Sequence, residues 1–126
     1  MTPDAFRLLA LSLPGVEEKS HQGHADFRVR GRIFATLGYP DDGFGMVKLS
    51  EEEQARRVRQ ESGVFTAAKG TWGAQGSTLV RLEAATEPLV LAAIRAAWER
   101  LVREESAAKP KPGTSPRGVR PKRSKI

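Results

Sequence analysis

Two histidines and an aspartate within six residues are the first candidates for chemistry. His21, His24 and Asp26 have the spacing of metal ligands, or of a general acid and base that work near neutral pH. The 126-residue sequence has no cysteine and no third histidine, so the set is short of metal donors. Because such pairs usually make ordinary hydrogen bonds, we expect no metal, no other cofactor and no catalysis here.

Three arginines at alternate positions are the second candidate. They are Arg28, Arg30 and Arg32. The pair Arg30-Gly31 is a tight-turn signal between two runs with the period of a strand. Guanidinium groups at the tip of such a hairpin could bind successive phosphates of a nucleic acid. The alternative is a solvated face on which Arg28 pairs with an acid such as Asp26.

Trp72 is the third candidate, in a glycine-rich segment over residues 67–76. It could stack on a base or a small ligand, with Lys69 and Gln75 as polar neighbours. The burial habits of large aromatic residues favour the alternative, in which Trp72 closes the open edge of the core and Gly73 and Gly76 permit the turn. No phosphate-binding loop is predicted, because no Gly-Lys-Ser/Thr follows the glycines.

The composition changes abruptly near residue 107. Residues 107–126 contain almost no bulky apolar side chains, so the sequence predicts a disordered tail. The tail has no acidic or aromatic residue, and it offers only charge for salt-sensitive, sequence-independent contact with a polyanion. The alternative is a tail that only increases solubility. Its basic residues are Lys109, Lys111, Arg117, Arg120, Lys122, Arg123 and Lys125.

The net charge of +6 and the sequence pI of 10.2 come from this tail. Residues 1–106 contain 14 basic and 15 acidic side chains, so the bulk pI does not identify the folded part as a nucleic-acid binder. No apolar run is long enough to span a membrane. We therefore expect a cytoplasmic protein with no membrane partner.

The elements that must position these candidates follow from periodicity and capping signals. The sequence predicts one α+β domain over residues 1–106, a two-layer sandwich with an antiparallel sheet and helices on one face, in the order α-β-β-β-α-β-β-α. Residues 16–23 stay unassigned and residues 67–76 are expected to be a loop. Thr2 and Ser50 are expected to cap the helices over residues 3–12 and 50–61. A third helix is expected from residue 86 onward, with one apolar stripe made of Leu91, Ile94, Trp98 and Leu101. The expected strands are 25–30 and 32–37, each alternating regularly, then 44–49, 64–66 and 78–82.

The sequence contains five stretches, at residues 13–17, 21–37, 47–49, 63–65 and 72–78, whose order and spacing resemble the MmcQ/YjbR family. The resemblance implies a two-layer α+β fold like that of secretion chaperones, and DNA binding through β-hairpin wings, here the hairpin around Arg28, Arg30 and Arg32. It implies no catalytic residue.

The sequence therefore predicts a non-enzymatic DNA-binding protein. The tail would supply affinity for phosphates, and the arginine-tipped hairpin would add a docking surface. One alternative is a protein-interaction module or homodimer that uses the sheet. Another is an enzyme or small-ligand binder that uses the sheet face and the Trp72 segment, with His21, His24 and Asp26.

Overall fold

The computed structural model describes residues 1–108, with side chains described to residue 104. The basic residues of the predicted tail, from Lys109 onward, lie outside the described residues. The helices are α1 (Pro3–Leu11), α2 (Glu51–Gln60), α3 (Gly70–Ala74) and α4 (Glu87–Ala108), with a 3-10 turn at Leu82–Ala84. The strands are β1 (Val16–His21), β2 (His24–Val29), β3 (Arg32–Leu37), β4 (Phe44–Lys48), β5 (Phe65–Ala67) and β6 (Ser77–Arg81).

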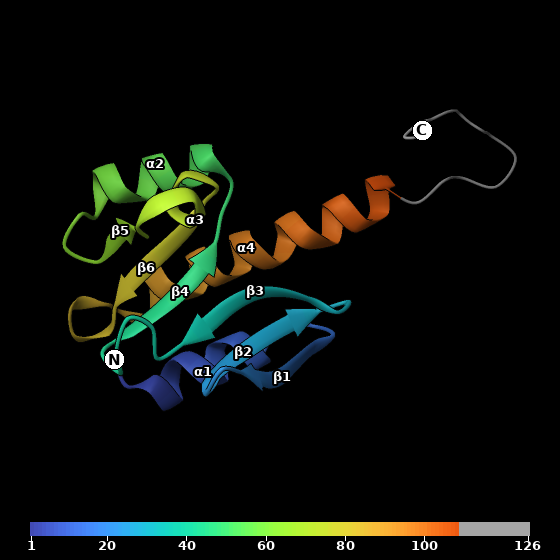
Figure 1. Cartoon of the computed structure of the whole chain (residues 1–126), viewed down its shortest axis with the longest axis horizontal. Coiled ribbons are helices and arrows are strands. Elements are labelled where there is room, and N and C mark those ends of the chain that lie inside the picture. The colour runs from blue at the N-terminus through green and yellow to red at the C-terminus, as the bar shows by residue number, and fades with distance from the viewer. Residues whose placement is uncertain (109–126) are drawn as a thin grey trace, which may run out of the picture.

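The six strands form one antiparallel sheet in the order β1-β2-β3-β4-β6-β5 (Figure 1). Helices α1 and α4 pack on one face, where Phe6 and Ile94 are buried with strand residues such as Phe27 and Val47. The predicted α+β sandwich of two layers is confirmed. None of the described helices covers the centre of the opposite face of the sheet, which is toward the viewer in Figure 1.

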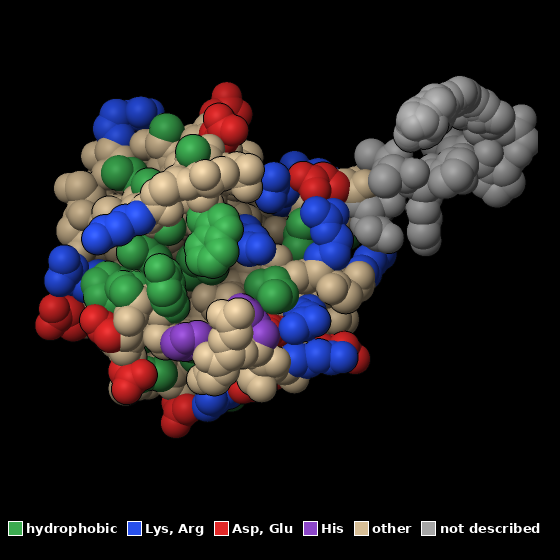
Figure 2. Space-filling model, in the orientation of Figure 1, with side chains coloured by type: hydrophobic (Ala, Val, Ile, Leu, Met, Phe, Trp, Pro, Cys, Tyr) green, Lys and Arg blue, Asp and Glu red, His purple; other side chains and the backbone are tan. Residues whose placement is uncertain are grey.

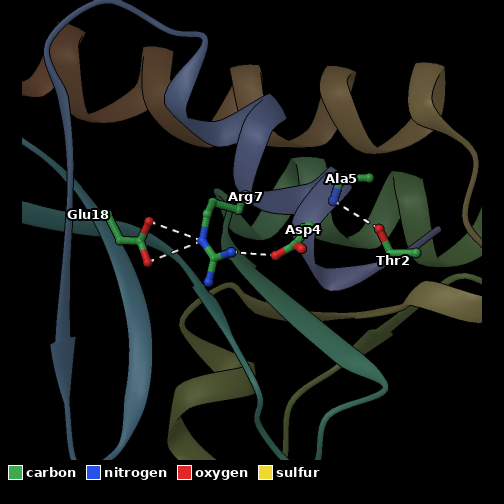
Figure 3. Close-up of polar contacts among 5 residues, drawn as sticks. All are labelled: Thr2, Asp4, Ala5, Arg7 and Glu18. Atoms are coloured by element: carbon green, nitrogen blue, oxygen red, sulfur yellow. Dashed lines mark hydrogen bonds and ion pairs between the residues drawn. The ribbon is translucent and has the colours of Figure 1, made fainter.

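Strand β1 lies in the stretch that the sequence left unassigned. It pairs with β2 along its whole length, but five of its six residues are exposed. An edge strand that buries no face carries no alternation of apolar residues, so periodicity could not reveal it. An ion pair from α1 holds it, with Arg7 Nε 3.1 Å from a carboxylate oxygen of Glu18 (Figure 3).

Both predicted helix caps are confirmed. The Thr2 hydroxyl accepts a hydrogen bond from the Ala5 N–H at 3.1 Å (Figure 3), and the Ser50 hydroxyl accepts one from the Glu53 N–H at 3.1 Å. Each bond satisfies a backbone donor that the first turn of a helix leaves unpaired. These local signals explain why α1 and α2 begin where the sequence predicted.

Helix α3 corrects the expected loop over residues 67–76. It has only five residues, too few for a helical period to appear in the sequence. The side chain of Gln54 holds it in place. The Nε2 group of Gln54 donates to the carbonyls of Gly73 and Ser77 at 2.9 and 3.0 Å and lies 3.2 Å from the Thr78 hydroxyl.

The hairpin of β2 and β3 is confirmed, with a tight turn in which Arg30 and Gly31 have φ values of 55° and 80°. The regular alternation expected for β3 is wrong at its first residues. Phe27 pairs with Ala35, whereas Arg28 pairs with Ile33. The residue between them, Phe34, therefore forms a β-bulge, which places Ile33 with Arg28 on the uncovered face.

Helix α4 crosses the covered face of the sheet. Ile94 and Leu101 of the expected apolar stripe are buried, and Trp98 is partly buried. The indole Nε1 of Trp98 donates to the Pro14 carbonyl at 3.0 Å, which ties the helix to the segment after α1. Within residues 1–108, no helix has both the length and the apolar content to cross a membrane.

Candidate binding site

A hollow of about 560 Å³ lies on the uncovered face of the sheet. Strands β3 and β4 pair only over Ala35–Leu37, so a gap opens where they diverge, beside Ile33 and Lys48. A volume of this size suits a small-molecule ligand. The lining combines apolar, basic, uncharged polar and acidic side chains: Ile33, Met46 and Trp72; His21, Lys48 and Arg100; Thr36, Gln75 and Ser77; and Glu51.

The charges around this hollow are mainly basic. Among the described side chains, Lys48 has no ion-pair partner. Arg100 comes from α4 and lies 3.4 Å from Glu104, which Arg32 also approaches at 3.3 Å. Figure 2 shows this face of the molecule, with histidines in purple and basic side chains in blue beside hydrophobic side chains in green.

A buried carboxylate supports His21. Asp26 is fully buried; its Oδ2 lies 2.7 Å from Nδ1 of His21, and its Oδ1 accepts from Nε of Arg28 at 2.7 Å. The hydrogen bond from Arg28 lowers the pKa of the Asp26 carboxyl, burial opposes this change, and the hydrogen bond from His21 reinforces it. Asp26 is therefore an anion that fixes the imidazole ring of His21 at the edge of the hollow.

His24 does not join this group. Its ring lies edge-on to the ring of Tyr39, with 6.2 Å between the ring centroids. In the part of the chain that the structure describes, no three His, Asp or Glu side chains are grouped so as to hold a metal ion. Of the three residues singled out by spacing, the structure brings His21 and Asp26 into direct contact.

The three arginines of the hairpin have different surroundings. Arg28 makes a two-pronged contact with Asp26, at 2.7 and 3.1 Å, which is the alternative considered from the sequence. Arg32 lies 3.3 Å from Glu104. Arg30 stands in the exposed turn and has no acidic partner among the described residues. One guanidinium of the three thus remains available at the tip of the hairpin.

The favoured interpretation of Trp72, as a plug of the core, is wrong. Its side chain is 62% exposed and lines the hollow together with Gln75. The buried residue of α3 is Gly73, whose backbone packs so closely that a Cβ atom would lie 1.6 Å from the Ala68 carbonyl oxygen. Lys69 is exposed at the start of α3 and does not line the hollow.

Sequence reasoning missed Lys48 and Arg100 as site residues. Lys48 follows Met46 by two positions in the predicted strand 44–49, so alternation alone puts both on one face. No sequence signal identified Arg100, because it reaches the hollow from a helix that packs on the other face of the sheet. Its place depends on tertiary packing rather than on any local pattern.

Comparison with known proteins agrees with this architecture. No curated protein matches the sequence. The fold is similar to that in the crystal structure of the Deinococcus radiodurans protein DR2400, described as a DUF419 domain, with a TM-score of 0.68 and 16% sequence identity. The alignment covers 92% of this chain and 96% of that chain. A model of the YjbR family matches residues 11–100, and the chain therefore belongs to the YjbR family.

Proposed function

We propose that this protein binds DNA, with the basic segment after α4 as its main source of affinity. The observation that carries the proposal is the separation of charge along the chain. All seven basic residues beyond residue 106 are unopposed by any acid, whereas residues 1–106 carry 14 basic and 15 acidic side chains. Dense cationic charge without acids favours contact with a polyanion through release of its counterions.

The folded domain would add one contact at the hairpin tip. Arg30 is exposed in the turn, and its guanidinium can donate to a phosphate oxygen without first leaving an acidic partner. Arg28 is a poor candidate for the same role, because binding a phosphate would break its contact with the buried Asp26. DNA binding is also the activity that the resemblance of the hairpin region to the family implies.

Fluorescence anisotropy of a labelled DNA duplex tests this proposal. We would compare the full chain with a full-length variant in which the seven basic residues from Lys109 to Lys125 are replaced by glutamine. If each side chain neutralises one phosphate, the slope of log affinity against log salt should flatten by about 6, at roughly 0.9 per phosphate. The same affinity and slope for both proteins would contradict the role of the segment.

Arg30→Gln tests the contribution of the hairpin. Loss of one phosphate contact should weaken duplex binding modestly, by roughly two- to five-fold, and reduce the salt slope by about 1. Lys19→Gln is the matched control, because it removes one positive charge from the exposed strand β1 away from the hairpin tip. Equal effects of the two substitutions would assign the change to net charge alone.

A further inference from the structure

We infer that the hollow between β3 and β4 binds a small ligand in which an aromatic ring is joined to a phosphate, of the size of a nucleoside monophosphate. This goes beyond DNA binding by the basic segment, which does not use the hollow. The volume of about 560 Å³ lies within the range for drug-sized ligands, roughly 300–1,000 Å³. The chemical class of the ligand follows from what lines the two sides of the hollow.

The aromatic part is inferred from Trp72. A 62% exposed indole is not needed for the core, and yet the backbone that carries it is closely packed. The Gln54 side chain hydrogen-bonds the α3 backbone at the Gly73 carbonyl, and Gly73 and Gly76 lie too close to neighbouring carbonyls for any side chain. An exposed ring on a rigid support is suited to stacking on a planar ligand.

The phosphate part is inferred from Lys48 and Arg100, which line the same hollow. Lysine and arginine together are typical phosphate-binding groups, one a point charge and the other a planar donor of two hydrogen bonds. Lys48 has no acidic partner among residues 1–104, and Arg100 shares Glu104 with Arg32. Glu51 is the single acid of the lining, so the hollow favours an anion.

His21 completes the donor set. The carboxylate of Asp26 occupies Nδ1 of the ring, and Nε2 has no hydrogen-bond partner in the described part of the chain. When the imidazole is protonated, both ring nitrogens are donors, so Nε2 can then donate to a phosphate oxygen.

Isothermal titration calorimetry of the full chain with AMP tests the inference, at about 0.15 M salt to screen exposed charges. We expect one AMP per chain. Adenosine and inorganic phosphate serve as separate titrants, and each should bind at least about ten-fold more weakly, because each lacks one of the two recognised groups. No heat of binding with AMP at millimolar concentration would overturn the inference.

Two substitutions locate the bound AMP. Trp72→Ala should weaken binding by roughly 5- to 150-fold, the range for loss of base–aromatic stacking. Arg100→Gln should weaken binding of AMP but not of adenosine. The matched controls are Leu8→Ala, an equally exposed hydrophobic residue on α1, and Arg95→Gln, an exposed arginine on the same helix α4. Site variants that bind AMP as tightly as these controls would overturn the inference.

The variant in which the seven basic residues from Lys109 to Lys125 are replaced by glutamine separates this inference from the proposed function. It should lose DNA affinity and keep AMP affinity. If it loses AMP affinity as well, AMP binds the basic segment and the inference is wrong. Displacement of labelled DNA from the full chain by AMP would also contradict it, because the hollow would then belong to the DNA-binding surface.

Discussion

Asp26 is a buried carboxylate that holds two side chains, Arg28 and His21, on the uncovered face of the sheet. It is fully buried, and its oxygens contact Arg28 and His21 at 2.7 Å each. A buried carboxylate is unfavourable unless it is paired and hydrogen-bonded. Here both conditions are met, and the hydrogen bond from Arg28 is the main reason that the pKa of Asp26 lies below its ordinary value of 3.8.

We expect Asp26→Asn to lower the free energy of unfolding by about 2–3 kcal/mol at neutral pH, because charge-assisted hydrogen bonds are lost. The folded pKa of Asp26 lies below its unfolded value. The stabilisation is therefore complete above that unfolded value and is lost as the pH falls through the folded pKa. Urea unfolding of both proteins at neutral pH and near pH 2 should show the difference shrinking in acid.

The matched control for this substitution is Asp42→Asn, in an exposed loop. It changes the same chemical group without affecting a buried pair, so its effect should be within about 0.5 kcal/mol. Equal stabilities of Asp26→Asn and the native chain at neutral pH would show that the buried carboxylate does not stabilise the fold.

At the scale of elements, α3 shows how a short helix can be fixed by its neighbours. Gly76, two positions after its last residue, has a φ of +108°, and a Cβ atom there would lie 1.8 Å from the Leu49 carbonyl oxygen. The Gly76 carbonyl also accepts from the Leu49 N–H at 3.0 Å. Only glycine meets both the conformation and the close approach.

Gly76→Ala should therefore lower the free energy of unfolding by at least about 2 kcal/mol, from the collision and the strained φ together. Gly63→Ala is the control, because open space surrounds Gly63 and its φ is not left-handed. It should be neutral or stabilise by about 0.4–1 kcal/mol, since alanine has fewer unfolded conformations. Thermal unfolding measures both, and equal effects would contradict the packing described for α3.

Elements with local signals were predictable from the sequence, and the others were not. Thr2 and Ser50 indicated the starts of two helices, and Arg30-Gly31 indicated the hairpin. Strand β1 buries no face, and α3 is too short to show a period. In the hollow, His21, Trp72 and Gln75 were singled out by residue type, but Trp72 was expected in the core, because exposure depends on tertiary packing.

At the scale of the whole molecule, α4 joins two parts of the sheet, the strands β1, β2 and β3 and the strands β4, β6 and β5. It packs against β2, β3 and β4, and Trp98 connects it to the Pro14 carbonyl. The limited pairing between β3 and β4 leaves the sheet itself a weak connection at this point. The helix therefore carries much of the packing that makes residues 1–104 one cooperative unit.

Ile94→Ala tests this role, because the side chain is fully buried on α4. Loss of its methyl and methylene groups should lower the free energy of unfolding by about 2–5 kcal/mol. Leu8→Ala, at a 68% exposed site, should have little effect. If α4 unites the two parts, urea unfolding of the native chain, followed by circular dichroism and by hydrogen exchange, should give one coincident transition. Separate transitions of the native chain would refute this role.

The bulge at Phe34 determines where strand β3 can lose or gain a residue. On either side of it, Ala35 and Ile33 keep the partners of a regular ladder, Phe27 and Arg28. Removing Phe34 would cost a buried aromatic ring, but the rest of β3 would keep its orientation. Removing Ile33 or Ala35 would also close the bulge, with Phe34 in the vacated place, whereas a deletion further along the strand would turn part of it over. Among relatives, we therefore expect insertions and deletions in this strand to gather at the bulge.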